Sequence, residues 1–597
     1  MNKPVWTPLK IAFVVLALAL LTLLVIGVAL PRFTESLFVH TSYYLLMVTV
    51  LCWAGTYLYA GRSTRLTTVV TWVKENWPGL VIAMVVTTAA WLAIDPALRM
   101  LSDEAGLVGT SKNFWATRTA TFTVSGKYYY DSYWDIGVAA DQRPALFPFL
   151  VSLLHVFGGY SYKNVFRFNL IVLPAFVVVA YRLAKSSAAK LSQGFQALPR
   201  SDAAFPSPAS PPRLDGETFA LVASLLVVAH PITLLSARSG GFDFFAAFFA
   251  LLVIKSLLDH IRAPSPENLA VLWMNLCMFA EVRYETGLFI PPVVALLLLF
   301  RLVTWSNLRP FSFIYSLTPA YLMPRSWQAV FRGSVPEQDP GAIVFSFKNF
   351  IDNAGAYFKT ILSPFASQPA HSAIVIALGV VGCILWLRWV YRRLLSRDWK
   401  APDLRFAVLV LTWMLVQATL VFTYVWGRAQ HPASARLVVA IDTFFAFPAA
   451  WVLTLWLRRW RPLVALLLAA AIFAFYLPVA SQHRMLNRLT QTREAATTWR
   501  FFESLHEKRI VIVADRPGLY TIMEYGAMDF ETARHDPVIF EALARRLFYD
   551  IYVVQQINLT TKQPFPAYDI WPTRTMQTML EFQNDANVMV RISRVGH

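Results

Sequence analysis

Long apolar runs recur along the whole chain, and they constrain its fold more than any other feature. The first, IAFVVLALALLTLLVIGVAL, occupies residues 11–30 and contains no charged side chain. About 20 apolar residues are enough for a helix to cross a bilayer. Of the 597 residues, 57% are hydrophobic and 15% are charged, against roughly 25% charged in soluble domains. We therefore expect a polytopic α-helical membrane protein.

The basic residues follow the same pattern. The chain has a formal net charge of +18, which in a soluble protein would suggest a nucleic-acid partner. Here the lysines and arginines lie in short clusters between apolar runs, as in RWVYRRLLSRDWK (388–400). Cytoplasmic loops of membrane proteins retain such clusters. We therefore expect these charges to contact membrane lipids, and we expect no nucleic acid.

The cysteines and the N-terminus exclude two other arrangements. Cys52, Cys277 and Cys383 all lie within apolar runs, so they form neither a disulfide framework nor a CxxC metal site. The first apolar run is longer than the apolar region of a signal peptide, which has about 7–15 residues, and no A-x-A cleavage site follows it. We expect this run to be a retained first helix.

The positions of Lys and Arg also predict which side of the membrane each loop faces. Lys3 and Lys10 place the N-terminus inside, so that three crossings place the segment 95–142 outside. The basic loop 182–217 is expected inside, so only one of two apolar pieces between 143 and 184 crosses fully; 145–158 is expected to be short, kinked or interfacial. About thirteen crossings result, near 11–30, 43–60, 78–94, within 143–184, and near 218–236, 242–258, 269–285, 287–304, 310–324, 372–391, 406–425, 437–457 and 462–479.

A change of composition divides the chain near residue 480. Residues 1–480 are expected to form the membrane domain, and 481–597 a small α/β domain on the periplasmic side of a bacterial inner membrane. In this tail, KRIVIVADRPGLYTIMEYG (508–526) predicts a strand, a turn and a helix, and RLFYDIYVVQQI (546–557) predicts a second strand. No glycine-rich phosphate-binding motif follows either strand, so nucleotide binding is not supported.

The topology predicted from Lys and Arg places side chains of both charges at the outer face. Asp103 and Glu104 begin the segment 95–142, and a carboxylate at the edge of the hydrocarbon is costly and usually functional. The charges therefore indicate a site at this face. The residues placed there are Asp103, Glu104, Asp131, Asp135, Asp141, Arg143, Arg238, Asp243, Glu281, Arg283, Glu285, Arg428, His431 and Arg436.

The acidic residues have a functional and a simpler interpretation. Asp103 or Glu104 could act as a base or bind a cation, or both could be solvated acids of an interfacial loop. Asp243 lies between apolar stretches, where it could serve a site or merely cap the N-terminus of a helix.

The arginines also have two interpretations. Guanidinium groups match phosphate oxygens, so Arg283, Arg428 and Arg436 could bind a phosphate. Alternatively, Arg283 in EVRYETG (281–287) could form only a local ion pair with its acidic neighbours. His431 has no partners at the spacing of a zinc site.

Taken in order, Asp103, Arg143, Asp243 and Arg436 resemble a pattern of GT-C fold membrane glycosyltransferases. The similar branch holds protein O-mannosyltransferases, aminoarabinose lipid A transferases and bacterial arabinofuranosyltransferases. Those families carry an Asp-Glu pair in the first long outer loop, matched here by Asp103 and Glu104. Three further motifs carry the resemblance: DQRPALFPFL (141–150), HPITLLSARSGGFD (230–243) and SARLVVAIDTFFAF (434–447).

The resemblance covers roughly residues 78–480, with two departures. The Asp-Glu pair follows the third expected helix rather than the first, which implies two added N-terminal helices. Gln142 and Arg143 replace an acidic-basic pair found in some relatives, which argues against a metal at that position. The tail fits the extracytoplasmic C-terminal domains of part of this group.

The resemblance implies an inverting glycosyltransferase. It would move a sugar from a polyprenyl-phosphate donor to a hydroxyl group of a lipid, glycan or protein at the outer face. Asp103 would be the base, and Glu104 and Asp243 would be further catalytic carboxylates. The cations holding the donor phosphate would come from Arg143, Arg283, Arg428 and Arg436. The resemblance establishes no cofactor, and it is compatible with a divalent metal.

Two rival functions follow from the same sequence. A transporter or lipid flippase often shows internal repeats and charges near mid-membrane, whereas this chain has no repeat and its charges gather at one edge. A non-catalytic scaffold would leave the pattern of acids and arginines unexplained. Convergence of Asp103 and Asp243 on one outward-facing cavity would favour the transferase, and their separation by a helix bundle would favour either rival.

Overall fold

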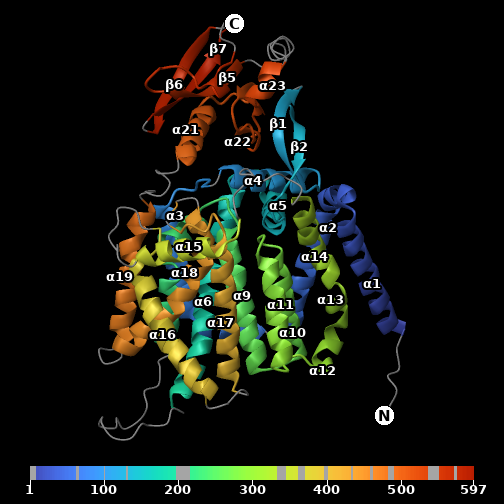
Figure 1. Ribbon diagram of the computed structural model, residues 1–597, viewed down its shortest axis with the longest axis vertical. Coiled ribbons are helices and arrows are strands. Elements are labelled where there is room, and N and C mark those ends of the chain that lie inside the picture. Colours follow the sequence, from blue (N-terminus) through green and yellow to red (C-terminus); the bar gives the residue numbers. More distant parts are fainter. Residues whose placement is uncertain are drawn as a thin grey trace.

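A computed structural model describes most of the chain. The described residues are 8–61, 66–99, 101–129, 132–196, 216–332, 344–360, 370–395, 401–429, 431, 434–457, 462–481, 490–535, 550–570, 575–585 and 587–596. Lys3 and Asp131, both used in the predictions above, lie outside them. Figure 1 shows a large bundle of helices with a smaller β-sheet domain at one end, which we call the sheet end.

The bundle confirms the expected polytopic helical fold. Its elements are α1 (Pro8–Ala29), α2 (Pro31–Ala60), α3 (Leu66–Ala93), α6 (Asn164–Gln196), α7 (Gly216–Leu226), α8 (Pro231–Ala237), α9 (Asp243–Arg262), α10 (Pro266–Ala280), η1 (Thr286–Phe289), α11 (Ile290–Leu299), α12 (Trp305–Leu308), η2 (Arg309–Phe311), α13 (Ser312–Ser316), α14 (Thr318–Arg332), α16 (Ala373–Leu395), α17 (Pro402–Thr423), η4 (Ser434–Val438), α18 (Val439–Trp456) and α19 (Pro462–Ser481). Within the described part, nine helices are long and apolar enough to cross a membrane, or ten if α7 and α8, bent by 73°, form one span. The other expected crossings correspond to the shorter α10, η1–α11 and α13–α14, which lie in the same bundle (Figure 1).

Short helices cover the sheet end of the bundle. These are α4 (Leu101–Ala116), α5 (Leu146–Gly158) and α15 (Phe347–Lys359). The short α5 ends before Gly159, whose φ of 73° lies in the left-handed region that glycine adopts readily. Of the two apolar pieces between 143 and 184, α6 is long and apolar enough to cross a membrane and α5 is shorter, as expected. Helix α15 was not predicted from the sequence. Its N-cap is Ser346, whose side chain accepts a hydrogen bond from the backbone N–H of Asn349.

The tail is an α/β domain, as expected, but its sheet extends beyond the tail. The elements are β1 (Thr121–Tyr129), β2 (Ser132–Ala140), α21 (Thr490–Ser504), β3 (Ile510–Val513), α22 (Gly518–Thr521), β4 (Gly526–Met528), α23 (Phe530–His535), β5 (Asp550–Asn558), η6 (Pro566–Tyr568), β6 (Met576–Asp585) and β7 (Val588–Val595). The two expected strands, β3 and β5, pair in parallel. The strand order is β2-β1-β4-β3-β5-β7-β6, so a hairpin of the outer segment 95–142 completes the sheet of the tail.

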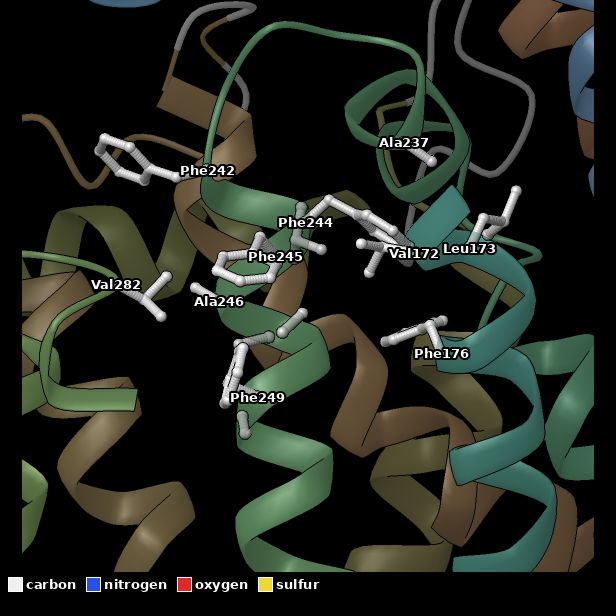
Figure 2. Packing of buried hydrophobic residues seen from close by; sticks show 14 of the residues in the cluster. Val172, Leu173, Phe176, Ala237, Phe242, Phe244, Phe245, Ala246, Phe249 and Val282 are labelled. Carbon is white, nitrogen blue, oxygen red and sulfur yellow. The ribbon is translucent and has the colours of Figure 1, made fainter. Parts of the chain in front are cut away.

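Aromatic packing fixes the beginning of α9 inside the bundle. Phe244 of α9 contacts Phe176 of α6, with ring centroids 5.0 Å apart, and Phe245 contacts Phe249 at 4.9 Å. Figure 2 shows the rings of Phe244 and Phe176 between the two helices. Buried aromatic pairs of this kind contribute about 0.5–1.5 kcal/mol each beyond the area that they bury. The residue just before them, Asp243, is therefore held in a defined place.

Candidate active site

Asp103 and Glu104 lie in the first turn of α4, at the sheet end of the bundle. Neighbouring residues of a helix point about 100° apart, so the two carboxylates face different surroundings. Asp103 faces two arginines and its side chain is 32% exposed. Glu104 points into the protein and is fully buried.

Arg143 contacts Asp103 from one side. Its Nη2 lies 3.4 Å from Asp103 Oδ1, and its Nη1 lies 3.0 Å from Asp141 Oδ1. Asp141 is buried and also accepts a hydrogen bond of 2.6 Å from the Thr110 hydroxyl. A Cβ atom at Gly106 would lie 2.3 Å from Arg143 Nη1, so a glycine at this position of α4 leaves room for the guanidinium group.

Arg436 joins the two expected acidic positions. Its Nη2 lies 2.6 Å from Asp103 Oδ2, and its Nη1 lies 3.4 Å from Asp243 Oδ2. Its Nε is buried and has no hydrogen-bond partner among the described residues. Asp103 and Asp243 thus share one guanidinium group and are not separated by a helix bundle.

Arg283 extends the cluster on the far side of Asp243. Its Nη1 lies 2.8 Å from Asp243 Oδ1, and its Nε lies 3.1 Å from Glu285 Oε1. The local ion pair considered for EVRYETG thus exists, but Arg283 also reaches α9. Asp243 is not the N-cap residue, because Phe242 occupies that position. Asp243 instead forms ion pairs with two arginines. Its negative charge in the first turn also interacts favourably with the helix dipole.

These contacts form a continuous chain of alternating charges. In order, its members are Asp141, Arg143, Asp103, Arg436, Asp243, Arg283 and Glu285. Four carboxylates face three guanidinium groups, so the cluster is nearly balanced without any ligand. The least buried acid of the pairs around Arg436 is Asp103, which places the accessible part of the cluster there.

The two carboxylates of α4 differ in their pKa values. Burial alone would raise the pKa of Asp103, but the charges of Arg436 and Arg143 outweigh burial and hold this pKa below its ordinary range. Burial raises the pKa of Glu104 to about 6, against the opposing charges of Arg99 and Arg436. Asp103 is therefore ionised at neutral pH, whereas Glu104 titrates just below it.

Glu104 connects backbone segments. Its Oε2 accepts hydrogen bonds of 2.9 Å from the backbone N–H groups of Arg99 and Gly240. These two residues belong to the segment before α4 and to the loop before α9. Glu104 thus holds together the loops that present Asp103 and Asp243, and it lies in a different direction from the arginines that contact Asp103.

The other charged residues expected at this face lie elsewhere. Arg428 is exposed and outside the chain of ion pairs, and His431 is also exposed. Asp135 pairs with Lys112. The Nε of Arg238 donates to the Ile94 carbonyl, and Glu281 accepts from the backbone N–H of Arg325.

His230, His371 and Asp442 form a buried group that was not predicted from the sequence. Each offers one ligand atom, and these atoms lie within 4.8 Å of one another; in the described part, this is the group suited to a metal ion. His230 stands in the motif 230–243, but residues so far apart in sequence give no recognisable spacing. Asp103 and Asp243, by contrast, each pair with arginines. The guanidinium groups already neutralise these carboxylates and would repel a metal cation.

An apolar cavity of about 120 Å³ lies toward the end of α9 that is opposite Asp243. It is lined by residues near the end of α9, among them Ile261 and Arg262, and by Trp389, Phe406 and Trp451. Its lining on α9 runs from Ile254 to Arg262, which at about 1.5 Å per residue lies roughly 16–28 Å along the helix from Asp243. It is therefore not part of the candidate active site.

Comparison with solved structures finds matches at low identity, among them these two. One is ArnT from Cupriavidus metallidurans bound to undecaprenyl phosphate, with 12% identity, a TM-score of 0.47, and coverage of 87% of this chain and 98% of that chain. The other is the Archaeoglobus fulgidus oligosaccharyltransferase tethered with an acceptor peptide, with 12% identity, a TM-score of 0.42, and coverage of 81% and 70%. No family model and no curated protein matches the chain. The function is therefore argued from the geometry of the site.

Proposed function

We propose that the protein is an inverting glycosyltransferase that moves a sugar from a polyprenyl-phosphate donor to an acceptor hydroxyl group. The observation that carries this proposal is the position of Arg436 between Asp103 and Asp243. A carboxylate with an exposed edge thus lies directly beside a fixed cation. Transfer from a phosphate donor requires this pair of groups, one for the acceptor proton and one for the departing phosphate.

Arg436, Arg143 and Arg283 would bind the donor phosphate. Guanidinium groups form paired hydrogen bonds to phosphate oxygens, and Arg436 Nε has no partner among the described residues. Fixed positive charges that stabilise developing negative charge contribute several kcal/mol in a water-poor site. A phosphate held in this way is a sufficient leaving group, so no separate acid is needed. Arg428, exposed and outside the cluster, is proposed only to contact the donor from the rim.

Asp103 would accept the proton of the acceptor hydroxyl group. In the structure Arg436 and Arg143 hold its pKa low, which makes it a weak base. A phosphate bound to the same arginines would offset their charge, so the pKa of Asp103 would rise once the donor is in place. The base would thus become effective when the donor is bound, with attack opposite the phosphate inverting the anomeric carbon.

The remaining carboxylates would position this pair. Asp243 would orient Arg436 and Arg283, and Glu104 would fix the loops on either side. The charge pattern of the loops supports a bacterial inner membrane with the sheet end in the periplasm. The acceptor would then be a lipid, a glycan or a protein of that compartment.

The test is transfer of radiolabelled sugar in membranes that contain the wild type or Asp103→Asn at matched expression. The donor panel comprises polyprenyl-phosphate arabinofuranose, mannose and glucose. The expected result is transfer by the wild type and a loss of at least about 100-fold in the variant, the range of general-base catalysis. Asp352→Asn, an exposed aspartate of α15, is the control and should retain activity.

Two outcomes would contradict the proposal. Equal transfer by the wild type and Asp103→Asn would remove Asp103 from the reaction. Absence of transfer with every donor, in membranes where the protein is folded, would favour a transporter or lipid flippase instead.

A further inference from the structure

A second buried cluster lies deeper in the bundle than the chain of ion pairs and has no part in the proposed transfer. His230 lies between α7 and α8, His371 precedes α16, and Asp442 lies in the first turn of α18. Their relative exposures are 0%, 1% and 0%. Three distant parts of the chain thus bring metal-binding atoms to one point.

Two of these side chains are oriented by contacts on their outer sides. His371 Nε2 donates to the carbonyl oxygen of Ala429 at 3.0 Å, so that Nδ1 faces Asp442 Oδ2 at 2.7 Å. The other carboxylate oxygen of Asp442 accepts a hydrogen bond of 2.6 Å from the Tyr357 hydroxyl. Metal-binding histidines commonly donate their second N–H to a backbone carbonyl, and ligating carboxylates are themselves hydrogen-bonded.

His230 is the member that a hydrogen-bond network alone does not explain. Its Nδ1 accepts a long hydrogen bond of 3.2 Å from the backbone N–H of Ser372. This nitrogen also lies 3.6 Å from Asp442 Oδ2, which is too far for a hydrogen bond. A metal ion bound through His230 Nδ1 would replace the long hydrogen bond from Ser372. His230 Nε2 has no hydrogen-bond partner in the described part of the chain.

We propose that His230, His371 and Asp442 bind one divalent transition-metal ion, for which zinc is the best match. Two imidazoles, one carboxylate and a water molecule form a common four-coordinate zinc site, with metal–ligand distances of about 2.0–2.2 Å. Ligand atoms around such an ion lie about 3.4 Å apart, and the observed distances of 2.7 and 3.6 Å bracket this value. His371 Nδ1 loses its proton to solvent when the ion binds.

The ion would join elements that carry the candidate active site. Asp442 lies six residues after Arg436 on η4 and α18, about 9 Å along a helix. His230 begins α8, which leads into the loop before Asp243. The metal would therefore fix the positions of the segments that carry Arg436 and Asp243. It would do so without contacting the substrate. Metal binding can be measured whether or not the protein is a transferase.

The test uses full-length protein in detergent with an affinity tag that contains no histidine. After incubation with zinc and removal of free ions, mass spectrometry of the elements measures zinc per chain. The wild type should hold about one ion, and His230→Gln and Asp442→Asn should lose it. His431→Gln removes an exposed histidine outside the cluster and should hold as much zinc as the wild type. His230→Gln keeps the contacts among Tyr357, Asp442 and His371, so it tests the site without removing their network.

Thermal unfolding gives a second readout that does not depend on activity. A ligand that binds only the folded state raises Tm, so zinc should raise the Tm of the wild type and of His431→Gln, but not that of His230→Gln. The proposal is overturned if the loaded wild type holds no zinc, or if His230→Gln holds as much zinc as the wild type.

Discussion

Two adjacent carboxylates of α4 have opposite environments, and this contrast explains why a single motif contains both. Asp103 meets arginines at the accessible edge of the cluster and stays ionised, whereas Glu104 accepts backbone hydrogen bonds in the interior. A buried carboxylate without a cation in direct contact binds its proton more tightly. Asp103 therefore suits chemistry at neutral pH, and Glu104 suits the support of the surrounding loops.

We predict that Glu104→Gln makes the protein more stable than the wild type at neutral pH but not at low pH. The pKa of Glu104 rises from an ordinary 4.5 to about 6 on folding. The proton therefore stabilises the folded state below pH 4.5, and this contribution is lost as the pH rises through 6. A shift of this size corresponds to about 2 kcal/mol. Glutamine keeps the accepting oxygen and has no carboxylate to ionise.

The measurement is Tm by intrinsic fluorescence between pH 4.5 and 7.5 for both proteins. The difference should appear between pH 4.5 and 6 and then remain constant. Glu531→Gln, an exposed glutamate of α23, should follow the wild type throughout. A difference that is independent of pH would mean that Glu104 is not titrating in this range.

At this scale the sequence predicts which residues gather but not how they pair. Asp103, Arg143, Asp243 and Arg436 were expected together, because loop charges reveal which loops share a face. The bridge from Arg436 to both aspartates depends on side-chain direction, which no spacing specifies. Arg428 had the same sequence signal as Arg436, yet it lies outside the cluster, because it belongs to the exposed loop after α17 rather than to η4.

At the scale of elements, the loop between α8 and α9 positions Asp243. Asn169 of α6 donates hydrogen bonds of 2.8 and 2.9 Å to the carbonyl oxygens of Ser239 and Gly241. Glu104 accepts from the backbone of Gly240. These buried contacts tie the loop to two other helices, so the loop itself has little freedom.

Gly240→Ala should disturb the site through this loop. A Cβ atom there would lie 2.8 Å from Leu98 Cδ2 and 3.2 Å from Glu104 Oε2. Overpacking of this kind costs about 1–3 kcal/mol, and displacement of Glu104 should lower sugar transfer about tenfold, or about 1.4 kcal/mol. Gly55→Ala is the matched control, because nothing lies within 4 Å of its added Cβ atom. Tm and sugar transfer should both fall for Gly240→Ala alone; unchanged values would show that the loop can shift without consequence.

At the scale of the whole molecule, the division at residue 480 is only part of the architecture. The apolar runs were sufficient to predict the helices, because hydrophobic length is a local property. The aromatic stretch GKYYYDSYWDIGVAA also matches an interfacial loop, so its strands β1 and β2 were not predicted. The pairing of Gly126 with Ala527 joins this hairpin to the sheet of the tail. Such a pairing between distant segments leaves no local pattern.

Lys112 of α4 connects the same two parts of the molecule. Its Nζ lies 3.6 Å from Asp135 of β2 and 3.8 Å from Glu524 before β4, and 3.9 Å from the centroid of the Tyr133 ring. The lysine side chain is only 5% exposed, whereas Asp135 and Glu524 are 23% and 43% exposed. Solvent therefore weakens each ion pair, but the buried ammonium group holds the bundle, the hairpin and the tail at one point.

We predict that Lys112→Met lowers stability by about 1–2 kcal/mol, because it leaves Asp135 without its cation and removes the cation–π contact. The control is Lys163→Met, which breaks a bundle-to-tail pair with Glu503 whose side chains are 50% and 40% exposed; an exposed pair contributes little. Tm should fall clearly for the first variant and barely for the second. In Lys112→Met, trypsin should also release the tail sooner than in the wild type. If both variants unfold alike, the burial of Lys112 adds no stability to the junction of the bundle and the tail.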